Sequence, residues 1–310
     1  MTRGVSEATD TWTVLRLMLW SADYLEQKGV ERARLDAEYL LAHVLGVGRL
    51  EMYLQHERLL ASAELDAFRP LLKRRAGREP LQYILGRQAF RDLELEVGPG
   101  VLIPRPETEG LVEVVLGWAR ERIRAVGSVP GRPGGLSALD LGTGSGAIAL
   151  ALLSEGPFDR VVATDTSAAA LEVAARNRDA QRMGERLDLR SGPYFDPLAS
   201  DERFDVVVSN PPYVAEGEHD ALPPEVSRWE PEGALFSGLD GLDALRRIVD
   251  GAGSALRPEG LLALEVGDGQ AAAVVALVRD RGRYGDVRVH LDLAGRERIV
   301  AATYSAADHR

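Results

Sequence analysis

An apolar stretch at residues 204–209 runs directly into Asn210-Pro211-Pro212-Tyr213, a tetrapeptide that could position a reacting group. Two consecutive prolines end a strand, because both fix φ and neither has an N–H group to donate. The side-chain carbonyl of Asn210 and the backbone carbonyl of Pro211 could then accept the two N–H groups of a planar amide or aromatic amine. Tyr213 could pack against the same planar group. The alternative is a plain turn at the end of a strand, and the tetrapeptide alone does not decide between the two.

A glycine-rich turn lies between a strand predicted at 138–141 and a helix predicted at 147–153. Its residues are Gly142, Thr143, Gly144, Ser145 and Gly146. Glycines at this place allow a tight turn and close approach of the backbone to a ligand, although a turn without a ligand explains the loop alone equally well. The dinucleotide fingerprint is G-x-G-x-x-G, so the G-x-G-x-G spacing makes a dehydrogenase a distant alternative.

Asp165 ends the next predicted strand, at 161–164. A carboxylate at such a strand end can accept both hydroxyls of a ribose. Asp165 could instead cap the helix predicted at 168–182, but Thr166 or Ser167 can do so in its place. We therefore favour a ligand-binding role for Asp165.

Tyr194 follows the strand predicted at 187–189. An aromatic ring at this position could pack on the edge of an adenine. Tyr194 or its neighbour Phe195 could also belong to the core, and the sequence leaves both possibilities open.

The elements that position these residues form an α/β pattern. Apolar strands alternate with helices from residue 138 to 266, with further strands at 204–209 and 261–266 and a helix at 242–256. Continuous apolar strands of this kind indicate a parallel sheet covered on both faces. Asn210 then falls at the carboxyl end of a strand, where open α/β sheets bind ligands. The last strands, at 286–293 and 297–304, predict an antiparallel hairpin at the sheet edge.

The amino-terminal part of the chain has a different pattern of apolar residues. Between residues 11 and 77, apolar residues recur at helical spacing, which predicts four or five helices. We expect a helical domain over residues 1–80, a β-hairpin linker over 81–104 and an α/β domain over 105–310. The Gly/Pro-rich residues 126–135 predict a surface loop. A basic cluster of Lys73, Arg74, Arg75 and Arg78 predicts a solvated helix end, with a partner contact as the alternative.

Composition narrows the function. The 310 residues carry a net charge of −11 and no cysteine. The acidic excess argues against a general nucleic-acid binder, and the missing cysteines exclude disulfides and thiolate metal sites. No apolar run is long enough for a membrane span, and the polar start lacks the core of a signal peptide. We expect a cytoplasmic protein without a metal, and a monomer.

The motifs together resemble methyltransferases that modify planar nitrogens. Asn-Pro-Pro-Tyr occurs in DNA adenine methyltransferases and in HemK-type protein glutamine methyltransferases. The chain is similar to the second group over nearly its whole length, specifically to the peptide-chain release factor glutamine methyltransferases. The matching segments are residues 79–86, Phe90, 101–109, 140–146, 210–213, 224–226, 229–231, 234–235, 238–242 and 264–267.

The resemblance implies a Rossmann-like class I domain that depends on S-adenosylmethionine (AdoMet). By that resemblance, Gly142 to Gly146, Asp165 and Asn210 bind the cofactor, and Asn210 to Tyr213 bind the substrate glutamine. That glutamine lies in the Gly-Gly-Gln loop of bacterial class-1 release factors. The tryptophan that often follows the third strand in the family is absent, and Tyr194 stands nearest to its place.

Two rival functions remain at this stage. A DNA adenine methyltransferase would need a basic DNA-binding face and an inserted recognition region, whereas this chain is acidic after about residue 80 and has no such insertion. A non-catalytic module that only binds AdoMet or a release factor is the second rival. The intact Asn-Pro-Pro-Tyr argues against it.

Overall fold

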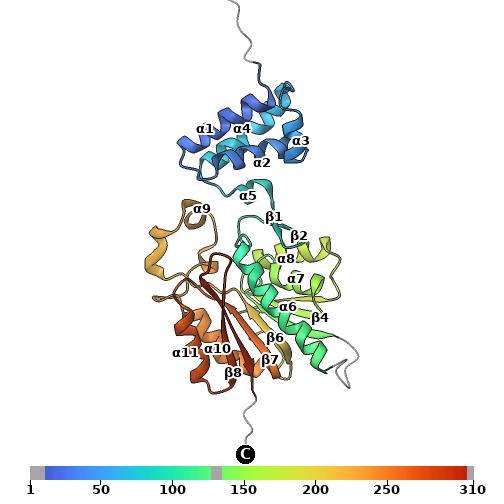
Figure 1. The fold of residues 1–310 in the computed structure, drawn as a ribbon, viewed down its shortest axis with the longest axis vertical. Coiled ribbons are helices and arrows are strands. Elements are labelled where there is room, and N and C mark those ends of the chain that lie inside the picture. The colour runs from blue at the N-terminus through green and yellow to red at the C-terminus, as the bar shows by residue number, and fades with distance from the viewer. Residues whose placement is uncertain (1–10, 127–134, 306–310) are drawn as a thin grey trace, which may run out of the picture. The chain divides into compact units, whose positions relative to one another are not determined.

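A computed structural model describes residues 11–126 and 135–305, so the loop predicted at 126–135 lies almost wholly outside the described residues, as do the first ten. The chain divides into two compact units, Met1–Gly86 and Arg87–Arg310. Each is drawn in Figure 1 and is described here by itself.

The first unit is helical. Its elements are α1 (Val14–Gln27), α2 (Ala33–Leu45), α3 (Arg49–Leu54), α4 (Ser62–Ala76) and α5 (Leu81–Leu85). Thr13 caps α1, because its side chain accepts a hydrogen bond from the backbone N–H of Arg16 at 3.2 Å. The core contains Leu25, Leu40 and Phe68, which are buried from three different helices. The predicted helical texture of this region is therefore confirmed.

The basic cluster at the end of α4 is not simply solvated, and for Arg75 the prediction was wrong. Arg75 is 6% exposed, and its Nε donates to Asp36 Oδ2 at 2.6 Å. Arg74 pairs with Glu79 at 2.5 Å, and Arg78 donates to the backbone carbonyl of Gly29 at 2.8 Å. Arg75 has a partner because a buried cation requires one, whereas Arg74 is exposed and Arg78 is partly exposed.

The second unit contains two sheets. A small antiparallel hairpin pairs β1 (Arg87–Phe90) with β2 (Leu93–Glu96). The large sheet has seven strands in the order β5-β4-β3-β6-β7-β9-β8. Its strands are β3 (Leu136–Leu141), β4 (Phe158–Asp165), β5 (Leu187–Ser191), β6 (Phe204–Ser209), β7 (Leu256–Glu265), β8 (Tyr284–Leu291) and β9 (Glu297–Tyr304). The first five run parallel, while β9 and the edge strand β8 are antiparallel, as predicted.

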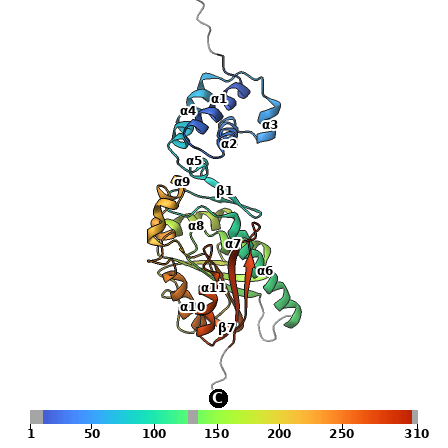
Figure 2. The same cartoon turned by 60° about the vertical axis from the view of Figure 1, so that its left-hand side comes forward.

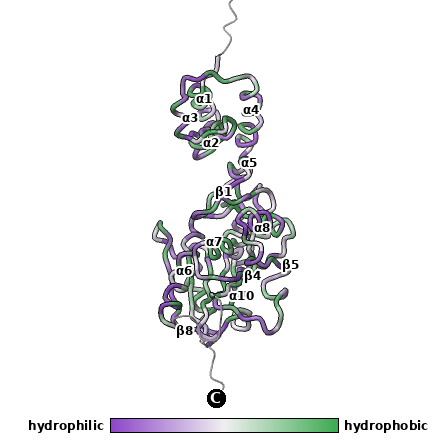
Figure 3. Tube along the Cα trace, turned by 90° about the vertical axis from the view of Figure 1, so that its right-hand side faces the viewer, coloured by the Kyte–Doolittle hydropathy of each residue, from purple (hydrophilic) through white to green (hydrophobic). Residues whose placement is uncertain are grey.

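Helices cover both faces of this sheet. They are α6 (Pro106–Val126), α7 (Ala147–Glu155), α8 (Ala168–Ala180), α10 (Asp243–Ala255) and α11 (Ala271–Asp280). The short α9 (Pro224–Ser227) lies in the segment between β6 and α10 and has no buried residue. Alternate residues of a strand point to opposite faces, so Ala138 packs with α6 and α7 while Leu139 packs with α10 and α11. Figure 2 shows these two helix pairs on opposite sides of the sheet. In Figure 3, α7 is coloured hydrophobic along most of its length, in agreement with its burial. The predicted α/β fold is confirmed.

The strand order fixes where a site can form. From β3 the chain moves outward to β4 and β5, then returns to the other side of β3 as β6. The order reverses between β3 and β6, and open α/β sheets bind ligands beyond the carboxyl ends of strands at such a point. The glycine loop leaves β3 and Asn210 leaves β6, so both emerge at this reversal.

Candidate active site

The ends of β3 and β6 are held side by side. Leu141 pairs with Ser209 in the sheet register, and Ser209 Oγ donates to the carbonyl of Leu141 at 2.6 Å. Ser209 is completely buried. Gly142 and Asn210, the next residues of the two strands, therefore start their loops from adjacent positions, although the sequence separates them by 68 residues.

The glycine loop has a left-handed backbone and an open outer surface. Gly142 and Gly144 have φ values of 70° and 56°, and a Cβ atom at either residue would meet nothing within 4 Å. The backbone therefore both requires glycine and leaves room for a ligand to approach. Asn177 of α8 holds the loop by donating to the carbonyl of Ser145 at 2.9 Å, while Thr143 and Ser145 are buried beneath the surface.

Asp140 is fully buried under this loop. Thr143 donates its hydroxyl to Asp140 Oδ2 at 2.7 Å, but Oδ1 has no hydrogen-bond partner among the described residues. Burial raises the pKa of Asp140 to about 7, and the hydrogen bonds from Thr143 and from the backbone of Ala149 only partly offset this. Because Asp140 is enclosed by protein atoms, it can act on a ligand outside the loop only through its charge.

Asp165 ends β4 beside the glycine loop. Its Oδ2 accepts the backbone N–H of Gly144 at 2.9 Å, and its Oδ1 accepts the N–H of Ser167 at 2.8 Å. Ser167 caps α8 by accepting the N–H of Ala170 at 3.2 Å, so the cap is one of the two residues predicted for it. Each carboxylate oxygen keeps a further lone pair, and Asp165 is half-buried, so it can still accept ligand hydroxyls.

Tyr194 lies beside the end of β4 through its backbone. Its carbonyl accepts the hydroxyl of Thr164 at 2.9 Å, and its φ of 47° is left-handed. Its half-buried ring packs against the core on the α10 face, and burial raises its pKa. Phe195 also packs there, against Gly251 of α10. The ring contributes to the core, and its backbone is anchored next to Asp165.

Asn210 belongs to a chain of hydrogen bonds that joins three elements. Its Nδ2 donates to Thr108 Oγ1 at 3.0 Å, and that hydroxyl donates to Glu265 Oε2 at 2.7 Å. Thr108 lies on α6 and Glu265 ends β7. Thr108 is 4% exposed and Glu265 is completely buried, so the chain of bonds is shielded from water.

Tyr213 lies next to the same carboxylate. Its hydroxyl is 3.4 Å from Glu265 Oε1, and its carbonyl accepts from Gln270 Nε2 at 2.9 Å. Burial and, after it, the charge of the nearby Glu265 raise the pKa of Tyr213 to about 12. Tyr213 is therefore neutral near pH 7 and cannot serve as a base there.

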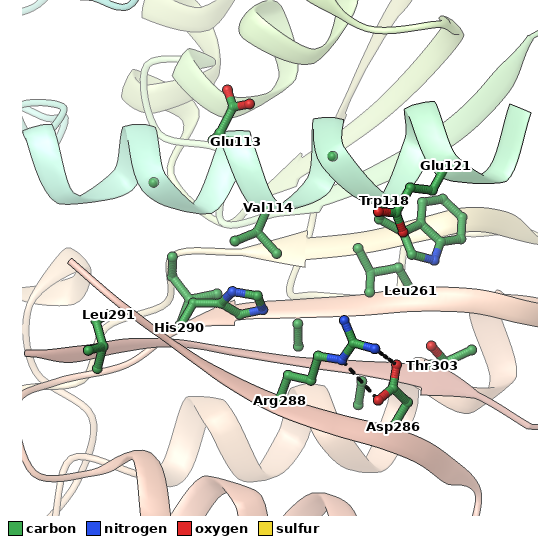
Figure 4. A pocket seen from close by; sticks show the side chains of 15 residues that line it. Glu113, Val114, Trp118, Glu121, Leu261, Asp286, Arg288, His290, Leu291 and Thr303 are labelled. Carbon is green, nitrogen blue, oxygen red and sulfur yellow. Dashed lines mark hydrogen bonds and ion pairs between the residues drawn. The ribbon is translucent and has the colours of Figure 1, made fainter. Parts of the chain in front are cut away.

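A separate groove of about 470 Å³ lies between α6 and the β8–β9 edge. Figure 4 shows Asp286 and Arg288 paired within it, with His290 beside them and Trp118 on the helix above. None of the predicted site residues lines this groove. The predicted site residues lie instead at the reversal point of the sheet.

Comparisons with known proteins identify the family of this chain. A family model described as the PrmC N-terminal domain matches residues 16–86, and one described as the methyltransferase small domain matches residues 132–223. The release factor glutamine methyltransferase of Geobacter sulfurreducens is 43% identical over 296 residues, which cover 96% of this chain and 98% of the relative. This chain belongs to the release factor glutamine methyltransferase family.

Other relatives carry the same name. The Gloeobacter violaceus protein is 44% identical, with 88% of this chain and 91% of the relative covered. The Streptomyces coelicolor protein is 42% identical, with 90% and 93% covered. The resemblance predicted from the motifs is confirmed, and the relatives do not favour a DNA adenine methyltransferase.

Solved structures agree at the level of the fold. The catalytic domain of human METTL16 bound to an RNA hairpin is 19% identical, with a TM-score of 0.53, and the match covers 77% of this chain and 83% of that chain. The N-terminal domain of human METTL16 in complex with SAH has a TM-score of 0.50 at the same identity, covering 76% and 84%.

The sequence alone did not indicate a role for several residues that lie in or near this site. Thr108 and Glu265 lie in segments that match the family, but nothing local indicated that they meet. The buried, unpartnered oxygen of Asp140 and the ion pair between Arg105 and Glu230 were also missed. The segments that match the family could have indicated these residues, since each residue lies in one of those segments.

Proposed function

We propose that this protein transfers a methyl group from AdoMet to the side-chain nitrogen of the glutamine in the Gly-Gly-Gln loop of class-1 release factors. The observation that carries the proposal is the anchored amide of Asn210. Its nitrogen donates to Thr108, so its oxygen is left to accept a hydrogen bond from a substrate. Family membership supplies the substrate class.

The residues at the reversal point fit AdoMet. The open surface at Gly142 and Gly144 lets a ligand approach the backbone, and the charge of Asp140 beneath the loop favours a ligand with positive charge. In this proposal Asp165 accepts ribose hydroxyls, and the ring of Tyr194, which is only half-buried against the core, packs beside an adenine. Thr143, Ser145 and Gly146 complete the loop, and Asn210 borders both ligands. When bound, AdoMet supplies a sulfonium methyl that the amide nitrogen takes up, leaving a thioether, and the nitrogen then loses its proton to water.

The protein's part is to orient the glutamine. An amide nitrogen is a weak nucleophile because its lone pair is delocalised. The Asn210 side-chain oxygen and the Pro211 carbonyl accept the two N–H groups, which turns the lone pair toward the methyl group. Pro211 and Pro212 fix this backbone, and the neutral Tyr213 ring packs against the amide plane. Catalysis comes mainly from positioning reacting atoms about 3–3.5 Å apart and excluding water.

We further propose how the protein meets its partners. The helical unit serves in docking the release factor, nucleic acid is not a direct partner, and the protein acts as a monomer in the cytoplasm. Among the described residues, no helix is long and apolar enough to cross a membrane.

Transfer of radiolabelled methyl from AdoMet tests the proposal. The full chain is offered a bacterial class-1 release factor, the same factor with Gly-Gly-Gln changed to Gly-Gly-Ala, and unmethylated DNA. Label on the first substrate alone is expected. Label on DNA would assign the tetrapeptide to DNA methylation, and AdoMet binding without any transfer would favour a non-catalytic module.

A further inference from the structure

The hydrogen bonds from Asn210 to Glu265 have only one consistent direction while Glu265 is ionised. A carboxylate only accepts, so the single hydroxyl hydrogen of Thr108 must go to Glu265. Thr108 Oγ1 can then only accept at its other side, and Asn210 must present its NH₂ group to it. The amide oxygen of Asn210 is thereby turned away from Thr108.

We propose that Thr108 and Glu265 are positioning residues that fix the orientation of the Asn210 amide, so that its oxygen meets the N–H of the substrate glutamine. This inference rests on the proposed function and explains how its central residue is kept in the productive state. The last side-chain torsion of asparagine is broad and nearly two-fold, so the amide can turn over if nothing holds it. A turned-over amide would set its NH₂ group against the substrate's N–H groups, and the reaction would lose an acceptor.

The charge on Glu265 is set by groups from every element that faces it. Two residues of α6 face Glu265: Thr108 donates a hydrogen bond to it, and the charge of Glu107 opposes its ionisation. Tyr213 faces it from the loop after β6, and Arg298 faces it from β9. Burial is the largest influence and raises the pKa of Glu265 to about 7, while Thr108, Arg298 and Tyr213 lower it.

Protonation of Glu265 would remove the constraint on the direction of the hydrogen bonds, because the constraint depends on a carboxylate that can only accept. A protonated carboxyl can donate to Thr108, whose hydroxyl could then donate to the oxygen of Asn210. The productive orientation is therefore secured above the pKa of Glu265 and lost below it.

Matched variants of Thr108 test the relay. Thr108→Val keeps the shape and removes the hydroxyl, whereas Thr108→Ser keeps the hydroxyl. We expect Thr108→Val to lower kcat for release factor methylation by about 10- to 100-fold, the range for a misplaced or missing polar group at a reacting centre. KM for the release factor should change little, because the rest of that protein supplies the binding, and Thr108→Ser should stay within about threefold of wild type. Wild-type kcat in Thr108→Val, or equal losses in both variants, would overturn the proposal.

The pH profile of Glu265→Gln gives a readout that a merely structural role would not change. With both substrates saturating, wild-type kcat should fall about tenfold from pH 8 to pH 6, as an essential group with a pKa near 7 requires. Glu265→Gln cannot ionise, so its kcat should be lower at pH 8 but nearly independent of pH. An unchanged acidic limb in this variant would contradict the relay. This measurement decides the matter if Thr108→Val fails to fold.

A test without turnover separates the relay from the proposed function. The chain has two asparagines, Asn177 and Asn210, so ¹⁵N-asparagine labelling gives two side-chain NH₂ signals, and Asn210→Ala identifies one of them. In wild type, the Asn210 amide hydrogens should exchange slowly, and Thr108→Val should speed this exchange at least tenfold while Thr108→Ser does not. Equal exchange rates in wild type, Thr108→Val and Thr108→Ser would contradict the relay even if methylation is observed. Slow wild-type exchange without release factor methylation would overturn only the proposed function.

Discussion

The guanidinium of Arg105 lies 2.5 Å from the carboxylate of Glu230, across 125 positions of the chain. Only 1% of the Glu230 side chain is exposed, against 31% for Arg105. Burial raises the pKa of Glu230, and the Arg105 charge opposes that shift. The pair links the residues just before α6 to the segment after α9, and both ends lie in segments that match the family.

Arg105→Met should therefore destabilise the protein. It leaves the Glu230 carboxylate buried without its partner, and we expect the free energy of unfolding to fall by about 1–3 kcal/mol, between the values for exposed and fully buried pairs. Urea titration of the full chain measures the loss. Arg176→Met is the matched control, because Arg176 and its partner Glu96 are both about half exposed and should contribute less. Equal losses in the two variants would show that burial of Glu230 does not strengthen the pair.

Asn210→Ala should abolish methyl transfer while leaving the fold intact. The substitution removes the acceptor oxygen and the bond to Thr108, but β6 and its pairing with β3 do not depend on this side chain. We expect the rate of release factor methylation to fall at least about 100-fold, as for other groups aimed at a reacting centre. Circular dichroism serves as the control for folding and should be unchanged. Wild-type turnover would refute the positioning mechanism.

Asp165→Ala should weaken AdoMet binding. The carboxylate supports the glycine loop through Gly144 and is the proposed acceptor for ribose hydroxyls. Loss of hydrogen bonds to a charged group corresponds to roughly a 10- to 100-fold rise in Kd. Isothermal titration calorimetry with AdoMet measures this rise. Asp188→Asn, on the neighbouring strand β5, is the control, since Asp188 pairs with Arg160 and Arg190 and should leave Kd unchanged. An unchanged Kd in Asp165→Ala would assign Asp165 to loop structure alone.

The sequence predicted the sheet and the places where its loops emerge, because both follow from local patterns. Apolar runs such as residues 204–209 mark buried strands, and the glycine loop and Asn210 follow two of them directly. Contacts between distant side chains left no such pattern. Thr108 and Glu265 are 157 positions apart, and helical periodicity does not tell which strand end a helix residue will face. Arg75 was misjudged for the same reason, since its partner Asp36 lies 39 positions away.

AdoMet affinity should depend on pH through Asp140. Burial raises the pKa of Asp140 to about 7, and its carboxylate lies beneath the glycine loop that is proposed to bind the positively charged AdoMet. A cationic ligand binds the ionised carboxylate better, so protonation competes with binding. Because the folded pKa lies above the ordinary one, affinity is full well above pH 7 and is lost as the pH falls through 7. With this pKa, Kd should rise about tenfold between pH 8 and pH 6.

Calorimetric titrations of AdoMet at these two pH values measure the effect without any turnover. The side chain that Asp140→Asn introduces cannot ionise. The Kd of Asp140→Asn should therefore exceed the wild-type Kd at pH 8, and it should be almost the same at pH 6 as at pH 8. Glu265→Gln is the control, because Glu265 has a similarly raised pKa but lies in the relay to Asn210 and should leave the pH dependence of binding in place. A wild-type Kd that stays constant from pH 8 to pH 6 would mean that the charge of Asp140 does not contribute to AdoMet binding. Loss of the dependence in Glu265→Gln would instead place the titrating group at the other end of the site.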